Sequence, residues 1–306
     1  MPQLPTAYVK PAKTPHALLR HLRAKGLGTK GQTEPALRAL EFVGYHRLLI
    51  YMRPLQDPQK RFVPAACFDD VLKLYDFDRR LRLVFLDAID RIEVGFRAAI
   101  INTLAVDKAC GPHFYLSAIH FEDCSKHRDL LRQVVNLREK DNAALNHYYR
   151  HYNTPALPPV WAVLEAMTIG QMSRLFCDLH LDHRKAVAVK FAYDETVLVS
   201  WLKSLTLLRN VCAHHGRLWN ASITASAPKY AKAIAVEFPS HVDRGRMFAR
   251  AVVVQALLEK IDPASDWKHR FKCLMATAPH EALAKAGKTT AELGLIADWE
   301  QRPFWN

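Results

Sequence analysis

The chain has 306 residues with 43 Lys and Arg against 30 Asp and Glu, so its formal net charge is +13. Half of the residues are apolar, which provides enough material for a buried core and excludes global disorder. Glycine is scarce, with only 11 residues. This composition predicts a helical protein of one or two domains rather than a β-sandwich, a β-barrel or a Gly-rich nucleotide fold.

The sequence carries no sign of a membrane or secretory location. No stretch approaches the ~18 uncharged apolar residues that a membrane helix requires, and the Pro-rich N-terminal segment has no apolar core of a signal peptide. The cysteines are scattered and form no CxxC pair. We therefore expect a cytoplasmic protein without a membrane partner, whose thiols are reduced and mostly buried in the core. The cysteines are Cys67, Cys110, Cys124, Cys177, Cys212 and Cys273.

Positive charge is concentrated near the start of the chain. Residues 1–61 contain eleven Lys and Arg but three acidic residues, a net charge of +8. Such an excess favours an anionic partner, most often a nucleic acid, although a solvated basic face would have the same composition. Lys25, Lys30 and Arg47 are the candidate RNA-binding residues of this region.

The spacing of apolar residues predicts helices along most of the chain. The first runs from 16 to 25, and the second begins at an N-cap Thr33 and continues to about residue 47. The strongest periodic block is 68–106, which we expect to form one or two long helices. Further helices are predicted over 125–151, 160–178, 182–191, 195–214 and 243–261. The predicted fold class is all-α, a helical bundle.

Two histidine pairs have spacings that could bind a metal on a helix. His147 and His151 are four residues apart, and His180 and His183 are three apart. No acidic ligand at helical spacing accompanies either pair, and histidines of this kind are more often exposed or packed on aromatic rings. The sequence therefore predicts no metal site and no cofactor.

One segment combines the residue types that RNA cleavage needs. Asn210 and His214 are four residues apart and are expected on one helical face, whereas Arg209 lies about 140° away and reaches that face only through its long side chain. Gly216 is predicted to end the helix, which would let Arg217 turn back toward the site.

The chemistry of this set suits attack by the 2′-hydroxyl of RNA on the adjacent phosphate. Imidazole can accept or donate a proton because its ordinary pKa lies near neutrality. A guanidinium can hold the negative charge of the transition state, and an amide can orient the imidazole or bind phosphate. Taken alone, these residue types more often form a buried polar network with a structural role.

The segment RNVCAHHGRLWN at 209–220 resembles the Abi-like (abortive infection) branch of the HEPN ribonuclease superfamily, whose motif is Rx4H. Four other segments resemble the family and occur in the same order along the chain. The resemblance covers roughly residues 13–220 and is weaker over 246–274. His46 stands where the family usually has Tyr, and Ala221 where a basic residue is common. The four segments are KGLGTKGQTEPALRALEFVGYHRLLIYMRPL, DRIEVGFRAAI, HFYLSAIHF and LPPVWAVLEAMTIGQMSRLF.

The resemblance implies a HEPN-like helical bundle that homodimerises and forms one ribonuclease cleft from the motifs of both subunits. It assigns catalysis to Arg209 and His214, with Asn210 as the polar residue after the arginine. Glu165 matches a recurrent acidic position that would orient Arg or His, while His215 and Arg217 extend the motif. The implied regions are a basic helical region at 1–61, the catalytic bundle at 62–220 and a helical extension packed on it at 221–306.

The sequence thus predicts a metal-independent endoribonuclease with a toxin-like role in antiphage abortive infection. Its expected partners are RNA, a second copy of the chain and an RNA or protein antitoxin. Two alternatives stay open at this stage. One is a non-catalytic RNA-binding HEPN module, and the other is a helical adaptor with a purely structural role.

Overall fold

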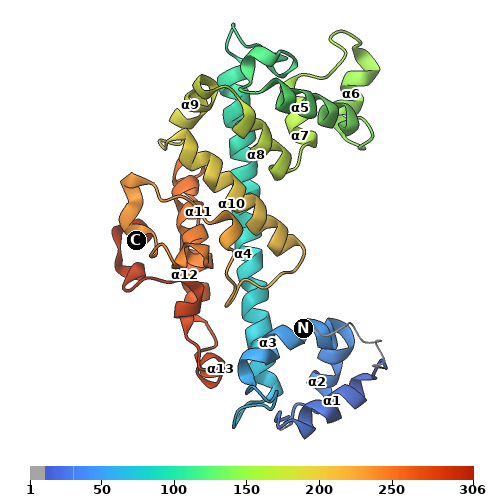
Figure 1. Ribbon diagram of the computed structural model, residues 1–306, viewed down its shortest axis with the longest axis vertical. Coiled ribbons are helices and arrows are strands. Elements are labelled where there is room, and N and C mark those ends of the chain that lie inside the picture. Colours follow the sequence, from blue (N-terminus) through green and yellow to red (C-terminus); the bar gives the residue numbers. More distant parts are fainter. Residues whose placement is uncertain (1–10, 30) are drawn as a thin grey trace, which may run out of the picture. The chain divides into compact units, whose positions relative to one another are not determined.

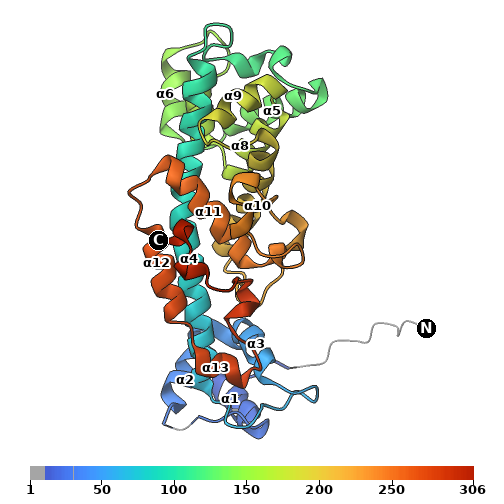
Figure 2. The same ribbon diagram turned by 90° about the vertical axis from the view of Figure 1, so that its left-hand side faces the viewer.

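A computed structural model describes residues 11–29 and 31–306 and confirms the all-α fold class (Figures 1 and 2). The described residues form thirteen α-helices and several short 3₁₀ and π segments, and they contain only isolated β-bridges in place of a sheet. None of the helices in these ranges is both long enough and apolar enough to cross a membrane.

The α-helices have the following bounds: α1 Pro15–Ala24, α2 Thr33–Ala39, α3 Tyr45–Met52, α4 Phe68–Ile100, α5 Cys124–Leu137, α6 Ala143–His151, α7 Val160–Ala166, α8 Ile169–Asp178, α9 Leu181–Val189, α10 Glu195–Ala213, α11 Met247–Ile261, α12 Trp267–Ala276 and α13 His280–Lys285. A π segment joins α2 to α3 at Leu40–Gly44, and another extends α4 over Ile101–Ala105. The long apolar repeat predicted over 68–106 thus corresponds to one helix with a π-helical end.

The chain packs as two compact units. The first comprises residues 1–79 and 277–290, and the second comprises 80–276 and 291–306. This division rests on packing, and the regions predicted at 1–61, 62–220 and 221–306 stay predictions.

Two buried carboxylates organise the first unit. The Tyr51 hydroxyl donates to Asp78 at 2.7 Å. Asp70 accepts from the Lys285 ammonium at 2.9 Å and from the Cys67 amide at 2.8 Å. These hydrogen bonds hold the pKa of Asp70 below its ordinary value although burial opposes them. Each buried charge is therefore matched by a donor, as its removal from water requires.

The second unit is built around the C-terminal part of α4. The indole of Trp267 in α12 donates to the Val84 carbonyl of α4 at 2.9 Å. Gly95 of α4 meets α11 so closely that a Cβ at this position would lie 2.7 Å from Cγ2 of Ile261. Glycine is therefore required there by the approach of two helices. Figures 1 and 2 show α11 and α12 running beside α4 in both views.

Local capping explains three differences between the predicted and the observed helices. The N-cap of α2 is Gln32, because the hydroxyl of Thr33 accepts instead from Arg23 at 2.7 Å. The helix predicted over 125–151 is interrupted, since Asn142 caps a new helix by accepting from two amides. The helix predicted over 160–178 is likewise divided, because Thr168 forms a capping box with Gln171 that starts α8.

The cysteines are all free, but the expectation that most of them lie in the core is wrong. Cys212 is buried, whereas Cys124 and Cys273 are exposed and the remaining three are half-buried. Apolar periodicity predicts which face of a helix is buried, but most of these thiols lie at helix ends or in loops, where periodicity carries no information.

Candidate functional site

The candidate motif lies at the C-terminal end of α10, and the helix ends earlier than expected. His214 is the C-cap, with its amide donating to the Asn210 carbonyl at 3.0 Å. His215 adopts a left-handed conformation with φ 58°, and its amide donates to Cys212 O at 3.0 Å. The amide of Gly216 then donates to Val211 O at 2.6 Å. These two bonds define a Schellman motif, so the residue that turns the chain is His215 and not Gly216.

Gly216 is required for a different reason, which is close packing against the helix. A Cβ on this residue would lie 2.8 Å from Cγ1 of Val211. Its carbonyl accepts from the buried Arg82 of α4 at 3.2 Å. Leu218 and Trp219, which follow, are fully buried. The turn after the motif is therefore fixed by its contacts with α10 and α4, and the residues that follow it are fixed by burial.

The three predicted catalytic residues lie within this last turn of α10 and its cap. Arg209 is half-buried, while Asn210 and His214 are exposed. The Arg209 guanidinium donates to the Asn210 side-chain oxygen at 3.4 Å. A guanidinium can bind a phosphodiester, and an imidazole can exchange a proton with it. The Asn210 amide and the His214 imidazole are exposed and can be reached by a polynucleotide, whereas Arg209 is reached only in part.

Glu165, expected to orient the arginine or histidine of the motif, pairs with an arginine of α4. Its carboxylate lies 3.5 Å from Arg97 Nη1 and its side chain is 58% exposed. Arg97 also pairs with Glu93 one turn earlier in α4 and donates to the Met167 carbonyl at 2.7 Å. Arg97 thereby connects α4 with the segment that contains α7.

The positive charge of Arg209 acts on Glu93, the partner of Arg97 in α4. Burial raises the pKa of Glu93, and the positive charges of Arg97 and Arg209 oppose that rise. Glu93, Arg97 and Glu165 therefore form a charged cluster within electrostatic range of Arg209. Glu93 and Arg97 were not among the residues predicted for the site, although their spacing of four residues inside DRIEVGFR indicates an ion pair on one helix face.

The remaining residues predicted for the site are more dispersed. The Arg217 guanidinium donates to the Asn220 carbonyl at 3.2 Å, which stabilises the loop after the turn. Lys25, the C-cap of α1, and Arg47 of α3 are half-buried residues of the first unit. Lys30 lies outside the described residues.

The fold and the position of the motif define a helical protein in which Arg209, Asn210 and His214 lie together at the end of one helix. Residues 38–220 match the model of the Abi-like protein family, and the chain therefore belongs to this family. Family membership indicates a role in abortive infection. Neither the curated proteins nor the solved structures include a match to this chain.

Proposed function

We propose that this protein is a metal-independent endoribonuclease of the HEPN type that acts as a toxin in antiphage abortive infection. The observation that carries this proposal is the position of the half-buried Arg209 and the exposed Asn210 and His214 at the end of α10. The membership in the Abi-like family supports the biological role.

The proposed reaction is a transesterification within the RNA. The 2′-oxygen attacks the adjacent phosphorus, its proton passes to an imidazole, and the bond to the 5′-oxygen breaks as that oxygen gains a proton. The products are a 2′,3′-cyclic phosphate and a 5′-hydroxyl. Arg209 stabilises the charge that develops on the non-bridging oxygens, and His214 transfers the proton.

This reaction needs a proton acceptor and a proton donor in the same step, and His214 can be only one of them. We therefore propose that two copies of the chain pair, so that His214 of one protomer acts as base and His214 of the other as acid. The charged cluster of Glu93, Arg97 and Glu165 would then stabilise the position of the Arg209 guanidinium electrostatically. A homodimer has a mass of twice 34.9 kDa, which light scattering after size exclusion measures directly.

The decisive experiment compares wild-type protein with Arg209→Ala and His214→Ala on end-labelled RNA in the presence of EDTA. We expect fragments ending in a 2′,3′-cyclic phosphate from the wild type, and a loss of at least about 100-fold in rate for each variant. Lys203→Ala on the exposed side of α10 and His241→Ala in an exposed loop are matched controls that should cleave normally.

Each alternative predicts a different result. Retention of RNA by all variants without fragments would favour the non-catalytic RNA-binding module, particularly if binding weakens steeply with salt. Cleavage that strictly requires Mg²⁺ would contradict the proposed mechanism. If Arg209→Ala lowers the melting temperature and no cleavage is found in the wild type, the residue has a structural role.

A further inference from the structure

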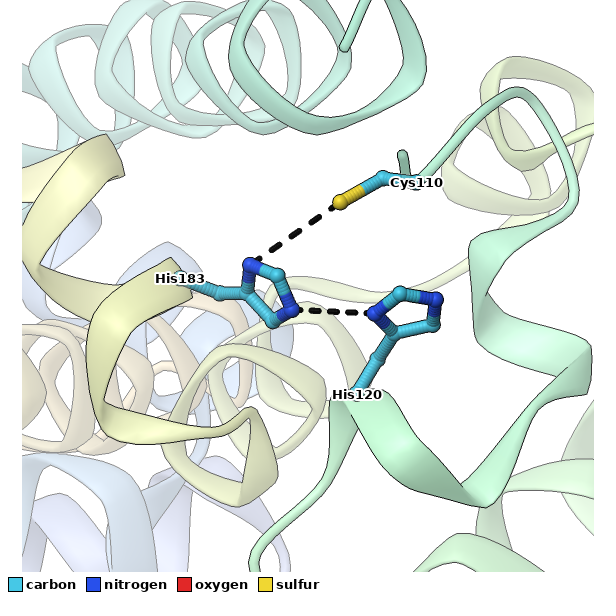
Figure 3. A group of neighbouring side chains, drawn as sticks. All are labelled: Cys110, His120 and His183. Atoms are coloured by element: carbon cyan, nitrogen blue, oxygen red, sulfur yellow. Dashed lines mark hydrogen bonds between the residues drawn. The ribbon is translucent and has the colours of Figure 1, made fainter. Parts of the chain in front are cut away.

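A thiol and two imidazoles meet in the second unit, with Cys110 and His120 from the segment after α4 and His183 from α9. Figure 3 shows Cys110, His120 and His183 turned toward one another. The Cys110 Sγ lies 4.0 Å from Nδ1 of His183, whose Nε2 lies 3.0 Å from Nδ1 of His120. One ligand atom of each residue lies within 4.8 Å of those of the other two.

The backbone around the cluster is firmly held. His120 ends the 3₁₀ turn Ala118–His120, and its carbonyl accepts from the His180 amide at 2.8 Å. Phe121 and Leu179 form an isolated antiparallel bridge directly beside it. His183 follows in the first turn of α9. The two histidines are therefore positioned by hydrogen bonds that do not depend on a metal.

Cys110 is placed by a tight turn around Asp107. The Asp107 carbonyl accepts from the amide of Cys110 at 3.1 Å, and its carboxylate accepts from the amide of Ala109 at 2.7 Å. The negative charge of Asp107 acts on all three side chains of the cluster. The turn thus brings a thiol and a negative charge to the same place, which favours a cation.

The cluster is partly shielded from solvent. His120 is 8% exposed, and Cys110 and His183 are half-buried. A bound metal deprotonates a coordinating thiol, so Cys110 would bind as a thiolate.

We propose that Cys110, His120 and His183 bind a zinc ion that joins the loop after α4, the 3₁₀ turn and α9. A thiolate with two imidazoles is a donor set that favours Zn²⁺ over Mg²⁺ or Ca²⁺. In a tetrahedral zinc site the ligand atoms lie about 3.3–3.6 Å apart. The separations of 4.0 and 3.0 Å involve different nitrogens of His183, and with one nitrogen from each ring the three ligand atoms lie within 4.8 Å of one another. Side-chain rotations that bring these atoms closer together complete the site. Water or the Asp107 carboxylate fills the fourth position.

The test is a metal titration of the full chain after chelation and removal of the chelator. We expect one equivalent of Zn²⁺ to bind and to raise the melting temperature. Co²⁺ should give the ligand-field bands of a tetrahedral site together with a thiolate charge-transfer band. Cys110→Ser should abolish that band, and both this variant and His183→Gln should weaken zinc binding by more than about 100-fold, since loss of even an indirect partner costs 10–100-fold.

Cys273→Ser is the matched control. Its thiol lies 3.4 Å from Nε2 of His269 on α12, and this exposed pair would bind zinc if any neighbouring thiol and imidazole sufficed. We expect the control to bind zinc as the wild type does. Asp107→Asn retains an oxygen for the turn and should weaken binding without removing the thiolate band.

Two results would overturn the proposal. One is the lack of saturable zinc binding by the wild type, and the other is an unchanged cobalt spectrum in Cys110→Ser. If a variant fails to fold, the melting temperature of the wild type with and without zinc decides, because a metal bound to the folded state must raise it. These measurements use no RNA, so they stand apart from the proposed nuclease activity.

Discussion

Arg250 of α11 provides a quantitative test of how the chain after the motif is held. Its side chain is fully buried, and its guanidinium donates to four main-chain carbonyls. Nη1 reaches Gly245 and Arg246, both at 3.1 Å, and Nη2 reaches Ile223 at 2.7 Å and Ser226 at 3.2 Å. One arginine thereby joins two 3₁₀ turns of the segment between α10 and α11, Thr224–Ser226 and Asp243–Gly245.

The magnitude follows from two opposing contributions. Burial lowers the pKa of Arg250 to about 10, and the difference from the ordinary value corresponds to about 3 kcal/mol of lost hydration. A hydrogen bond from a charged donor contributes about 1.5–3 kcal/mol, and a buried carbonyl that loses its donor costs about 1–3 kcal/mol. Arg250→Met removes the hydration penalty but takes the guanidinium away from all four carbonyls. The Gly245 carbonyl still accepts from the Ile223 amide at 2.8 Å, so the cost falls mainly on the carbonyls of Ile223 and Ser226. After the gain from the lost hydration penalty, we expect the free energy of unfolding to fall by about 1–3 kcal/mol.

Urea denaturation of the full chain, followed by circular dichroism, measures this loss. Arg250→Lys should be nearly as destabilising, because a single ammonium cannot reach four carbonyls in two directions. Lys260→Met, on an exposed position of the same helix, should change the free energy of unfolding by less than about 0.5 kcal/mol. A loss below about 1 kcal/mol for Arg250→Met would refute the reasoning, since the carbonyls would then be satisfied without the guanidinium.

Two further substitutions or conditions test other parts of the second unit. His215→Gly should raise the free energy of unfolding by about 0.5–1 kcal/mol in thermal or urea denaturation, because glycine adopts the left-handed conformation of the Schellman turn without strain. A loss of stability would show that the imidazole contributes more than the backbone strain costs. Burial lowers the pKa of His120 and His183 in the folded chain below the value of about 6.5 that they have in the unfolded chain. The stability they contribute is therefore fully present above about pH 6.5 and is lost as the pH falls through their lower folded pKa values. Metal-free protein should therefore lose stability between pH 7 and pH 5 more steeply than His120→Gln/His183→Gln; equal slopes would contradict this.

Much of the fold follows from short-range patterns in the sequence. Apolar residues recurring every three or four positions predicted most of the helices, including the long α4, because a helix in a bundle must bury one face. Family-specific residues around Arg209 and His214 likewise located the candidate site at one end of α10. These features depend on neighbours within a few residues along the chain.

Helix ends were less predictable, because they depend on competing local hydrogen bonds. The end of α10 illustrates this: Gly216 is the residue whose type suggests a helix stop, yet His215 adopts the left-handed conformation. Gly216 is needed instead for its contact with Val211. The break before α8 depends in the same way on a capping box that apolar spacing does not reveal.

Apolar spacing and local motifs could assign residues to helices, but they could not say which side chains from distant helices meet. Arg97 binds Glu165 from 68 positions further along the chain, and His120 contacts His183 from 63 positions further. Cys110, which the sequence suggested to be a core thiol, joins two histidines in a polar cluster. Such groupings arise only when helices pack, because burial and long-range contacts, rather than neighbouring residues, bring their charges and ligand atoms together.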